Sequence, residues 1–578
     1  MCIHQECLPE AYLSAGITFC NRMINVYHRC SSALVWGTGL LFLPALGYAQ
    51  NGGLSGAQLH GDFQTDVQTY KSDPAIGAPD VPERLRSNTF ANLILTAGKF
   101  TAGARYEAYL PQLQGFDPRY RGQGVPYRYA TYDAGRIAVT VGNFYEQFGS
   151  GLIFRAYEER NLGIDNSIDG LRVRAQPVPG LRLTGIIGKQ RRFFELSPAT
   201  VRGIDGEVSL NELIPAMDSA ATRLTIGGSF ISKYQADDDP ALVLPENVGA
   251  GAVRVGLSNG GFNLNVEYAR KANDPSATNG FIYRAGESLL ATATYARNGF
   301  GLVVGAKRVD NMDLRTDRSA TGNVALLNYL PALTKQHTYA LAASIYPYAT
   351  QRLGEMSGQI ELTYHVPSGG LGGTYGTDIA VNFSAVNAID KKASADLNPT
   401  STSGYESGFL AVGGPVYFRD FNVELHRRFN KKWKANAMYA HFVYNKDVIE
   451  GLGQDAYGII SSDLGVLDVA YKLTPKQSLR TEVQGLFTQR DQGSWAMLLL
   501  EYTYSPHFFV TAYDQYNYGN PHAEQQIHYV TGQIGYIGGT TRVALGYGRQ
   551  RAGIVCVGGV CRYVPASNGA TLSITSSF

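Results

Sequence analysis

Long apolar runs and cysteines are both scarce in this sequence. Beyond residue 49 no run of about 18 apolar residues occurs, which excludes an ordinary membrane-spanning helix there. Only two of the six cysteines, Cys556 and Cys561, lie in that region. Charged residues make up 17% of the chain and the formal net charge is +2, so we expect no nucleic acid as a partner.

Catalytic and metal-binding motifs are missing as well. The sequence has no HExxH pair, no G-x-S-x-G elbow and no phosphate-binding glycine loop. Its ten histidines are scattered along the chain, so we expect no metal and no cofactor. We predict that the protein is not an enzyme. Catalytic groups brought together from distant segments are the alternative, because such groups leave no fixed spacing in a sequence.

Apolar and polar residues alternate where the chain beyond residue 56 begins. Leu59 and Phe63 fall on one face of an expected strand, and Asp62 and Gln64 fall on the other. Such period-two alternation is the wall pattern of a membrane β-barrel. A single-layer wall also accommodates 578 residues, which exceed one ordinary globular core. We therefore predict an all-β fold, a large antiparallel transmembrane β-barrel.

Short and long connections alternate along the predicted strands. Short turns rich in Gly, Asn and Pro occur at 258–261, 296–299, 430–433, 474–477, 504–507 and 537–540. Long polar connections occur at 71–86, 111–126, 235–248, 272–285, 309–334, 390–412, 446–457 and 518–525. This sorting predicts short periplasmic turns, long extracellular loops and roughly 22–26 strands.

One region does not fit this strand count. Between a rising strand at 300–308 and a periplasmic turn at 367–373, the pattern predicts one further crossing within 309–357 that has no clear place. We expect either an additional wall strand there or a segment, Leu330 to Lys335, that dips into the lumen.

Residues 1–49 are predicted to be an N-terminal extension and signal peptide. Arg29 supplies a positive charge, residues 33–46 form an apolar stretch too short to span a bilayer, and the small residues up to Ala49 suit cleavage after it. A short membrane anchor is the alternative. We expect residues 50–578 to form a single barrel in the cell outer membrane, in contact with its lipid and lipopolysaccharide.

Two features near the C-terminus predict specific roles. Two glycines between Cys556 and Cys561 form a tight turn, and an exported protein favours a disulfide between these cysteines. Zinc is the alternative, although two cysteines supply only half of a site. The alternating strand that ends in Phe578 resembles the signal read by the outer-membrane assembly machinery, which we expect to be a partner during insertion.

The segment 143–169 differs from its surroundings. Several glycines lie among a dense set of charges, and the period-two alternation resumes only near Ile168. We predict that this segment leaves the wall and forms a constriction inside the pore; a long solvated loop is the alternative. Its predicted pore-lining residues are Glu146, Arg155, Glu158, Glu159, Arg160, Asp165 and Asp169.

Four arginines on the strands that follow are predicted to join this constriction. Apolar residues such as Leu171 and Ile187 mark the lipid face, where a charge costs about 2–4 kcal/mol at mid-depth, so the arginines between them are expected to face the lumen. A ring of arginines favours anions. A structural salt-bridge network is the alternative, with Arg191 close by and acids such as Glu107 as partners. The four arginines are Arg172, Arg174, Arg182 and Arg192.

Four stretches carry a resemblance to a known family. They are GNFYEQFGSGLIFRAYEERNLGIDNSIDG, YLPALTKQHTY, YPYATQ and CVGGVCRYVPASNG with the terminal strand. With them, most of residues 51–578 resembles an uncharacterised family of Bacteroidota outer-membrane β-barrel (porin-like) proteins. The resemblance implies the barrel and its compartment, and it implies no substrate.

The sequence therefore leads to two functional hypotheses. The first is a porin-like channel for passive passage of small polar or anionic solutes, with 143–169 as its constriction. The alternative is a filled barrel that acts as a structural or docking component of a larger envelope complex, in secretion or outer-membrane assembly. The balance of opposite charges and the long loops favour this alternative.

Overall fold

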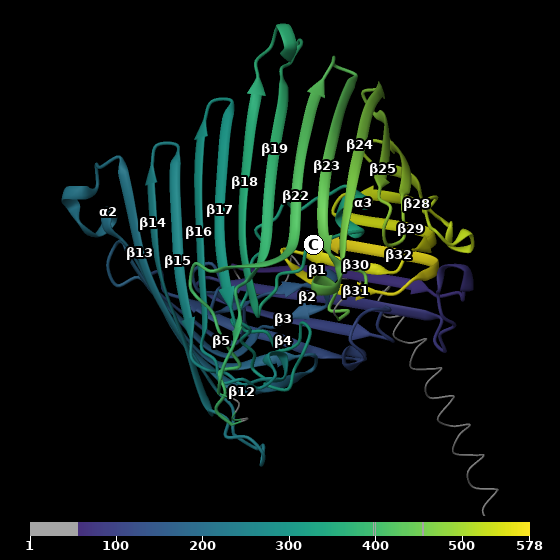
Figure 1. The fold of residues 1–578 in the computed structure, drawn as a ribbon. Coiled ribbons are helices and arrows are strands. Elements are labelled where there is room, and N and C mark those ends of the chain that lie inside the picture. The colour runs from purple at the N-terminus through teal and green to yellow at the C-terminus, as the bar shows by residue number, and fades with distance from the viewer. Residues whose placement is uncertain (1–55, 397, 399, 454–455) are drawn as a thin grey trace, which may run out of the picture.

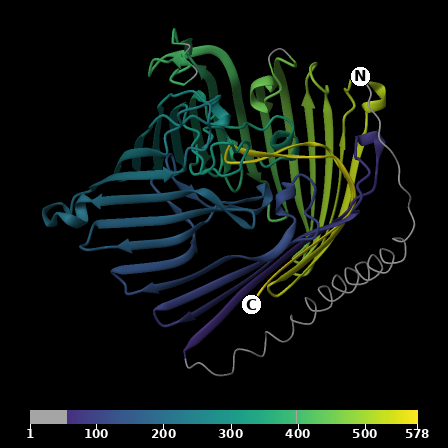
Figure 2. The ribbon, with the colours of Figure 1, turned by 90° about the horizontal axis from the view of Figure 1, so that it is seen from below.

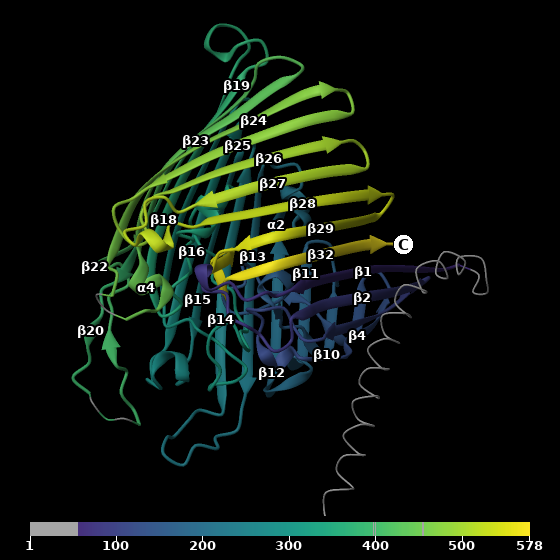
Figure 3. The same cartoon turned by 90° about the vertical axis from the view of Figure 1, so that its right-hand side faces the viewer.

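The computed structural model describes residues 56–396, 398, 400–453 and 456–578, and these residues form a closed β-barrel. Twenty-four antiparallel strands make one continuous sheet (Figure 1), as the sequence predicted. The first strand, β1 (Ala57–Thr69), pairs with the last, β32 (Ser567–Ser577), and so closes the ring. Figure 3 shows β32 lying between β29 and β1. The predicted signal peptide lies outside the described residues.

The other wall strands follow one another in chain order around the ring. They are β2 (Leu85–Ala97), β3 (Phe100–Tyr109), β4 (Gly122–Asp133), β5 (Ile137–Phe144), β10 (Ile168–Ala175), β11 (Leu181–Arg192), β12 (Glu195–Ser209), β13 (Thr222–Tyr234), β14 (Asn247–Asn259), β15 (Phe262–Lys271), β16 (Gly286–Arg297), β17 (Phe300–Asp310), β18 (Gly354–Val366), β19 (Thr377–Ile389), β22 (Val412–Arg428), β23 (Trp433–Asn445), β24 (Ile459–Thr474), β25 (Gln477–Phe487), β26 (Trp495–Tyr504), β27 (Phe508–Tyr516), β28 (His528–Gly538) and β29 (Thr541–Gln550).

Alternate residues of these strands form an exposed apolar surface around the barrel. Partners in register share a face, as Leu171 on β10 and Val141 on β5 do, and both are exposed. This is the arrangement that places apolar side chains in lipid and polar ones in the lumen. Further exposed members of the surface are Leu93, Ile187, Ile204, Val253, Ile360, Phe383, Leu467, Val483, Leu498, Val530 and Leu545.

Connections at the two rims differ in length, as predicted. One rim carries mostly tight turns, and the other carries the long loops. The predicted additional crossing within 309–357 is wrong, because β17 pairs directly with β18 and the 311–353 segment between them contains no wall strand. Short elements within the connections are η2 (Pro74–Ile76), η3 (Pro118–Tyr120), α2 (Leu210–Leu213), η5 (Pro215–Met217), η6 (Ala277–Asn279), η7 (Gly370–Gly372), β20 (Lys392–Ala393), β21 (Tyr405–Glu406), α4 (Lys446–Glu450) and η8 (Ala523–Gln525).

Three connections from the long-loop rim fold into the barrel and contact one another. We call residues 145–167, 311–353 and 551–566 together the inner body. Figure 2 shows its teal loops and its yellow hairpin inside the ring of strands. Its elements are β6 (Glu146–Gln147), β7 (Arg155–Ala156), β8 (Glu158–Glu159), η4 (Arg160–Leu162), β9 (Ile164–Asp165), α3 (Ala340–Ser344), β30 (Gly553–Val557) and β31 (Val560–Val564).

Backbone hydrogen bonds join the three parts of the inner body. The amide of Arg155 donates to the carbonyl of Leu327 over 2.8 Å, and the amide of Tyr329 donates to Gly151 over 2.9 Å. At the hairpin tip, the amide of Thr350 donates to Gly559 over 3.0 Å. The hairpin holds the predicted disulfide, Cys556–Cys561, which the structure confirms.

Two apolar clusters fix the inner body to two arcs of the wall, which β18 separates. In the first, Phe148, Ile153 and Leu327 are buried against inward residues of β11–β17. In the second, Leu341 of α3 and Tyr348 are buried against inward residues of β19 and β22–β26. The 311–353 connection belongs to both clusters, so it links the two halves of the barrel through its interior.

The last residue closes the barrel against the first strand. The backbone of Phe578 exchanges two hydrogen bonds of 3.0 Å with Gly61. Its ring occupies the space above Gly61, where a side chain on β1 would collide with it. The terminal aromatic therefore contributes to the seam between β32 and β1.

Candidate functional site

The candidate site is the charged network where segment 145–167 enters the lumen. β5 turns away from β4 at Gly142, whose φ is +96°. A Cβ there would collide with the carbonyl oxygen of Arg128, so glycine permits both the backbone conformation and the close approach. The chain returns to the wall at Ile168, which pairs with Phe144. Between these two residues the segment lies inside the ring of strands, where its residues Phe148 and Ile153 are buried.

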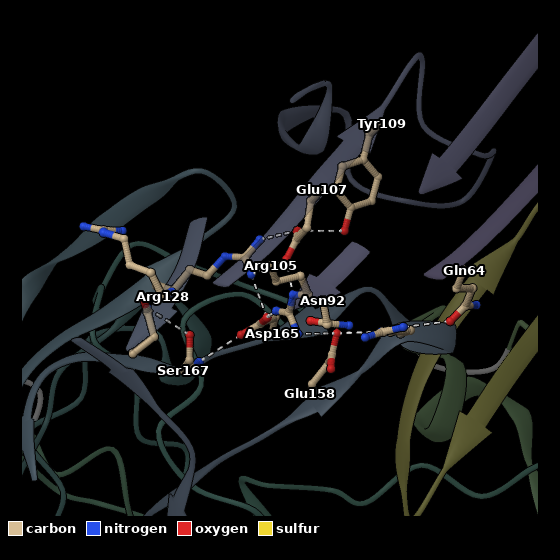
Figure 4. A network of polar contacts seen from close by, with 12 residues as sticks. Gln64, Asn92, Arg105, Glu107, Tyr109, Arg128, Glu158, Asp165 and Ser167 are labelled. Carbon is tan, nitrogen blue, oxygen red and sulfur yellow. Dashed lines mark hydrogen bonds and ion pairs between the residues drawn. The ribbon is translucent and has the colours of Figure 1, made fainter. Parts of the chain in front are cut away.

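Asp165 lies at the centre of the network (Figure 4). It accepts hydrogen bonds from Arg191 Nη1 over 2.6 Å, from the Tyr145 hydroxyl over 2.9 Å and from the Ser167 amide over 3.1 Å. It also forms an ion pair with Arg105. Its side chain is only 8% exposed, so these donors replace water almost completely.

The network continues from Asp165 in two directions. Toward the wall, Arg191 and Arg105 share the carboxylate of Glu107, at 2.6 and 2.7 Å. Toward β1, Arg105 pairs with Glu158 at 3.0 Å, and Glu158 pairs with Arg160 at 2.8 Å. Three guanidinium groups thus meet three carboxylates, and the buried charge is balanced.

The charge state of Asp165 follows from its surroundings. Burial by itself would raise the pKa of this carboxyl, because desolvation disfavours the charged form. The guanidinium groups of Arg191 and Arg105 outweigh burial and hold the pKa below its usual value. The carboxylate therefore stays ionised at neutral pH and binds segment 145–167 to β3 and β11.

Most of the predicted pore-lining arginines have an acidic partner. Arg172 and Arg174 both pair with Glu146, at 3.5 and 2.7 Å. Arg182 pairs with Glu207 at 2.8 Å, and Arg192 pairs with Asp317 at 2.6 Å.

The remaining predicted residues have three different settings. Arg155 lies between the rings of Tyr157 and Tyr329, at 4.4 and 4.1 Å from their centroids. Glu159 caps η4 by accepting the amide hydrogen of Asn161 over 3.2 Å. Arg160 also donates to Gln64 of β1 over 2.8 Å, which ties the segment to a second part of the wall.

Asp169 is a correction. It lies on the face of β10 that carries the exposed Leu171, and its carboxylate meets the exposed Arg128 at 3.4 Å. The prediction that Asp169 lines the pore is wrong. Period two alone places it outside, because it is two residues from Leu171.

Sequence reasoning missed a row of buried lysines on alternate strands. Lys233 on β13 donates to the carbonyl of Arg315 over 2.8 Å, and Lys271 on β15 donates to that of Asp313 over 2.6 Å. Lys307 on β17 donates to the carbonyl of Pro331. These lysines attach the 311–353 connection to the wall. The available signal was their place in the period-two alternation, which puts each lysine on the inward face of its strand.

Three cavities adjoin the inner body, of which the smallest, about 110 Å³, lies between the 311–353 connection and the hairpin. Another, of about 400 Å³, is lined by Asp165, Arg191, Arg192 and Arg562, and by residues 321–325. The third, of about 250 Å³, lies beside Ser150, which donates to Glu267 over 2.7 Å through its amide.

Within the residues that the structure describes, no group of three or more His, Cys, Asp or Glu is placed to hold a metal ion. No helix in the same part of the chain is long and apolar enough to cross a membrane. Chemically, the site offers paired charges and hydroxyl groups around cavities of about 250 and 400 Å³.

Several solved structures are similar to this one in fold. The P pilus usher (PapC) translocation pore has a TM-score of 0.42 and 10% identity, over 90% of this chain and 99% of that one. The siderophore receptor PirA from Pseudomonas aeruginosa has a TM-score of 0.39 and 12% identity, over 90% and 80%. A BenF-like porin from Pseudomonas fluorescens Pf-5 has a TM-score of 0.34 and 12% identity, over 76% and 100%. Scores this low say nothing about function.

Sequence comparison gives the family. No curated protein matches the chain. A family of unknown function, DUF6029, matches residues 30–578. This match covers the whole barrel, including the inner body and the terminal strand, and the chain therefore belongs to the DUF6029 family of unknown function.

Proposed function

We propose that this protein is an outer-membrane channel for the passive passage of small polar solutes, narrowed by the inner body. The observation that carries the proposal is that segment 145–167 leaves the wall and packs against β1, β3, β11 and β15 inside the barrel. An inward loop of this kind narrows the lumen while the ring of strands stays closed.

The outward surface supports the location in the outer membrane. Its exposed apolar side chains would be unfavourable in water over so large an area, whereas a bilayer accommodates them. Lipid and lipopolysaccharide would then surround the wall. The Bacteroidota origin implied by the resemblance stays a prediction.

The charge pattern bears on the solute class. Arg172, Arg174, Arg182 and Arg192 each have a carboxylate within 4 Å, so little positive potential is left to attract anions. Hydroxyl and amide groups lie beside these pairs, and balanced polar walls suit neutral hydroxylated solutes. We therefore favour small polar solutes over strongly anionic ones.

Planar-bilayer recording of the purified protein tests the proposal. Deletion of residues 150–163 should raise the conductance, because it removes the part of the inner body that includes η4 and β8. Replacing Arg172, Arg174 and Arg182 by glutamine should shift ion preference toward cations, because it removes three positive charges and leaves the carboxylates of Glu146 and Glu207 without these partners. A conductance of zero in both the intact and the deleted protein would refute the channel.

A second candidate is a filled barrel that serves as a structural or docking component of an envelope complex. Two apolar clusters favour it, because they pack the 311–353 connection against both halves of the wall and such packing resists solute-driven movement. Native-membrane co-purification with a stoichiometric partner, together with absent conductance, would support this candidate over the channel.

A further inference from the structure

The barrel wall has an interruption between β4 and β5 near the long-loop rim. The ladder between them runs only from Asp133↔Ala138 to Tyr129↔Gly142. Beyond it, residues 122–128 of β4 pair with β3 alone. β5 and β10 are 8 residues long, whereas the flanking β4 and β11 have 12 residues each. The two short strands thus leave a gap in the wall above their ends.

Two local features produce this gap. Gly142 turns β5 away from β4 just where the ladder ends. A bulge in β4 between its pairs with Arg105 and Glu107 also changes the direction of the strand. The Asn143 side chain makes the last contact across the seam, accepting the amide hydrogen of Arg128 over 3.0 Å. Because an unpaired strand edge exposes backbone polar groups, something must cover residues 122–127.

The tip of the β11–β12 hairpin covers part of the gap. Phe194 lies against Gly122 and Gly124 of β4, with ring atoms 3.6–3.7 Å from where a Cβ would stand at each. Phe193 meets Tyr120 edge to face, with ring centroids 4.7 Å apart. Two aromatic side chains therefore bridge the rim of the opening in place of strand pairing.

A cavity of about 360 Å³ lies between the hairpin tip that carries Phe194 and the short strands β5 and β10. Its lining combines apolar residues, namely Val125, Pro126, Phe194 and Leu196, with polar ones, namely Gln123, Arg128, Asp169, Arg191 and Glu195. It lies on the outer side of the barrel. Asp169 shares a face with the exposed Leu171, and Gln123 accepts a hydrogen bond from the exposed Tyr106. Arg191 lines both this cavity and the 400 Å³ cavity inside, so it separates the two.

We propose that this outer cavity is a binding site for a single-chain amphiphile with an anionic headgroup. Arg128 is 61% exposed and its only acidic partner among the described residues, Asp169, is 3.4 Å away, so its guanidinium can form a shorter, stronger bond to a carboxylate or phosphate. The exposed Val125 and Leu196 line the same cavity, and an acyl chain that covered their apolar surface would bind favourably. The volume fits the range of about 300–1,000 Å³ of small-molecule sites.

This site goes beyond the proposed channel and does not depend on it. The headgroup would bind outside the network of Asp165, and the chain would lie along the outer face, where lipid is expected. A conducting barrel without the site and a non-conducting barrel with it are both physically consistent. Binding, and not conductance, is therefore the quantity to measure.

The test is binding of dodecanoate to the full barrel in nanodiscs of zwitterionic lipid, by displacement of a fluorescent fatty acid. Arg128→Gln should weaken binding about ten-fold, the effect of losing one charge-assisted hydrogen bond. Arg182→Gln is the matched control, because Arg182 is 63% exposed and likewise pairs with one carboxylate, Glu207. Gly124→Leu, which fills the cavity without a positive-φ conflict, should weaken binding as well.

Two further arms identify the headgroup chemistry and the source of the ligand. Dodecanol, with the same chain and no charge, should bind more weakly and should not respond to Arg128→Gln. Native mass spectrometry of protein extracted from membranes should reveal a retained anionic lipid if the outer leaflet supplies the ligand, and a site free for added dodecanoate if a soluble amphiphile does. The proposal would be overturned if the extracted protein retained no anionic lipid and also failed to bind added dodecanoate. Equal binding of dodecanoate by the Arg128→Gln and Arg182→Gln variants would overturn it as well.

Discussion

Replacement of Asp165 by asparagine is the most direct test of how the inner segment is held. The substitution keeps the size of the side chain and removes its charge. Arg105 and Arg191, whose side chains are 3% and 2% exposed, would then share only Glu107 and Glu158. The positive charges of these two buried guanidinium groups would then be only partly neutralised. The new asparagine amide beside them would itself be a hydrogen-bond donor.

The expected cost is large. Removing one partner of a buried, hydrogen-bonded ion pair destabilises by about 3–5 kcal/mol, because the remaining charge stays buried. The wall strands keep their ladders, so this cost falls on local opening of segment 145–167. An energy of this size raises the population of the opened segment by roughly two to four orders of magnitude.

Limited trypsin digestion in detergent micelles measures this opening. Arg155 and Arg160 lie in the segment and are protected in the closed state, so Asp165→Asn should be cut there while the barrel stays resistant to unfolding. Asp169→Asn is the matched control, because its pair with Arg128 is partly exposed and worth about 0–1 kcal/mol. If Asp165→Asn resists trypsin as the wild type does, the network does not hold the segment.

The same carboxylate predicts a pH dependence with a definite sign. Its pKa in the folded protein lies below the usual value of about 3.9, because Arg191 and Arg105 outweigh burial. A depressed pKa contributes stability that is fully present above the unfolded pKa and is lost as the pH falls through the folded value. The wild type should therefore stay closed down to about pH 4 and open below it, as pepsin sensitivity would measure, whereas Asp165→Asn should lack this acid step.

Three further outcomes are expected elsewhere in the chain. Cys556→Ser should cost less than about 3 kcal/mol in urea unfolding, because the disulfide closes a very short loop, and the wild-type mass should be lower by two hydrogens than that of the reduced form. Deletion of Phe578 should reduce the amount of heat-resistant barrel in membranes, because the seam with Gly61 loses its ring and two hydrogen bonds. Lys271→Met should cost about 1–3 kcal/mol locally by leaving the Asp313 carbonyl unsatisfied, which faster hydrogen exchange of residues 311–331 would report; the exposed Lys189→Met should not change that exchange.

The barrel itself could be predicted from the sequence because its determinants are local. Period-two alternation fixes which residues of a strand face outward, as Leu171 and Ile187 do, and turn residues mark where each strand ends. The pairing of Cys556 with Cys561 was equally local, since only a tight turn separates them. The glycines and charges of 143–169 likewise indicated a segment that leaves the wall.

Partnerships inside the lumen were decided by the tertiary structure. Asp165 meets Glu107's partners, Arg105 and Arg191, only because the barrel closes and brings β3, β9 and β11 together. The course of the 311–353 connection depends on lysines from three separate strands, and no periodic pattern records such contacts. Alternation specifies the side of a sheet on which a residue lies, because it is a property of one strand. Which charges then neutralise one another depends on the closed ring, because burial makes an unpaired charge costly and only the assembled barrel supplies its partner.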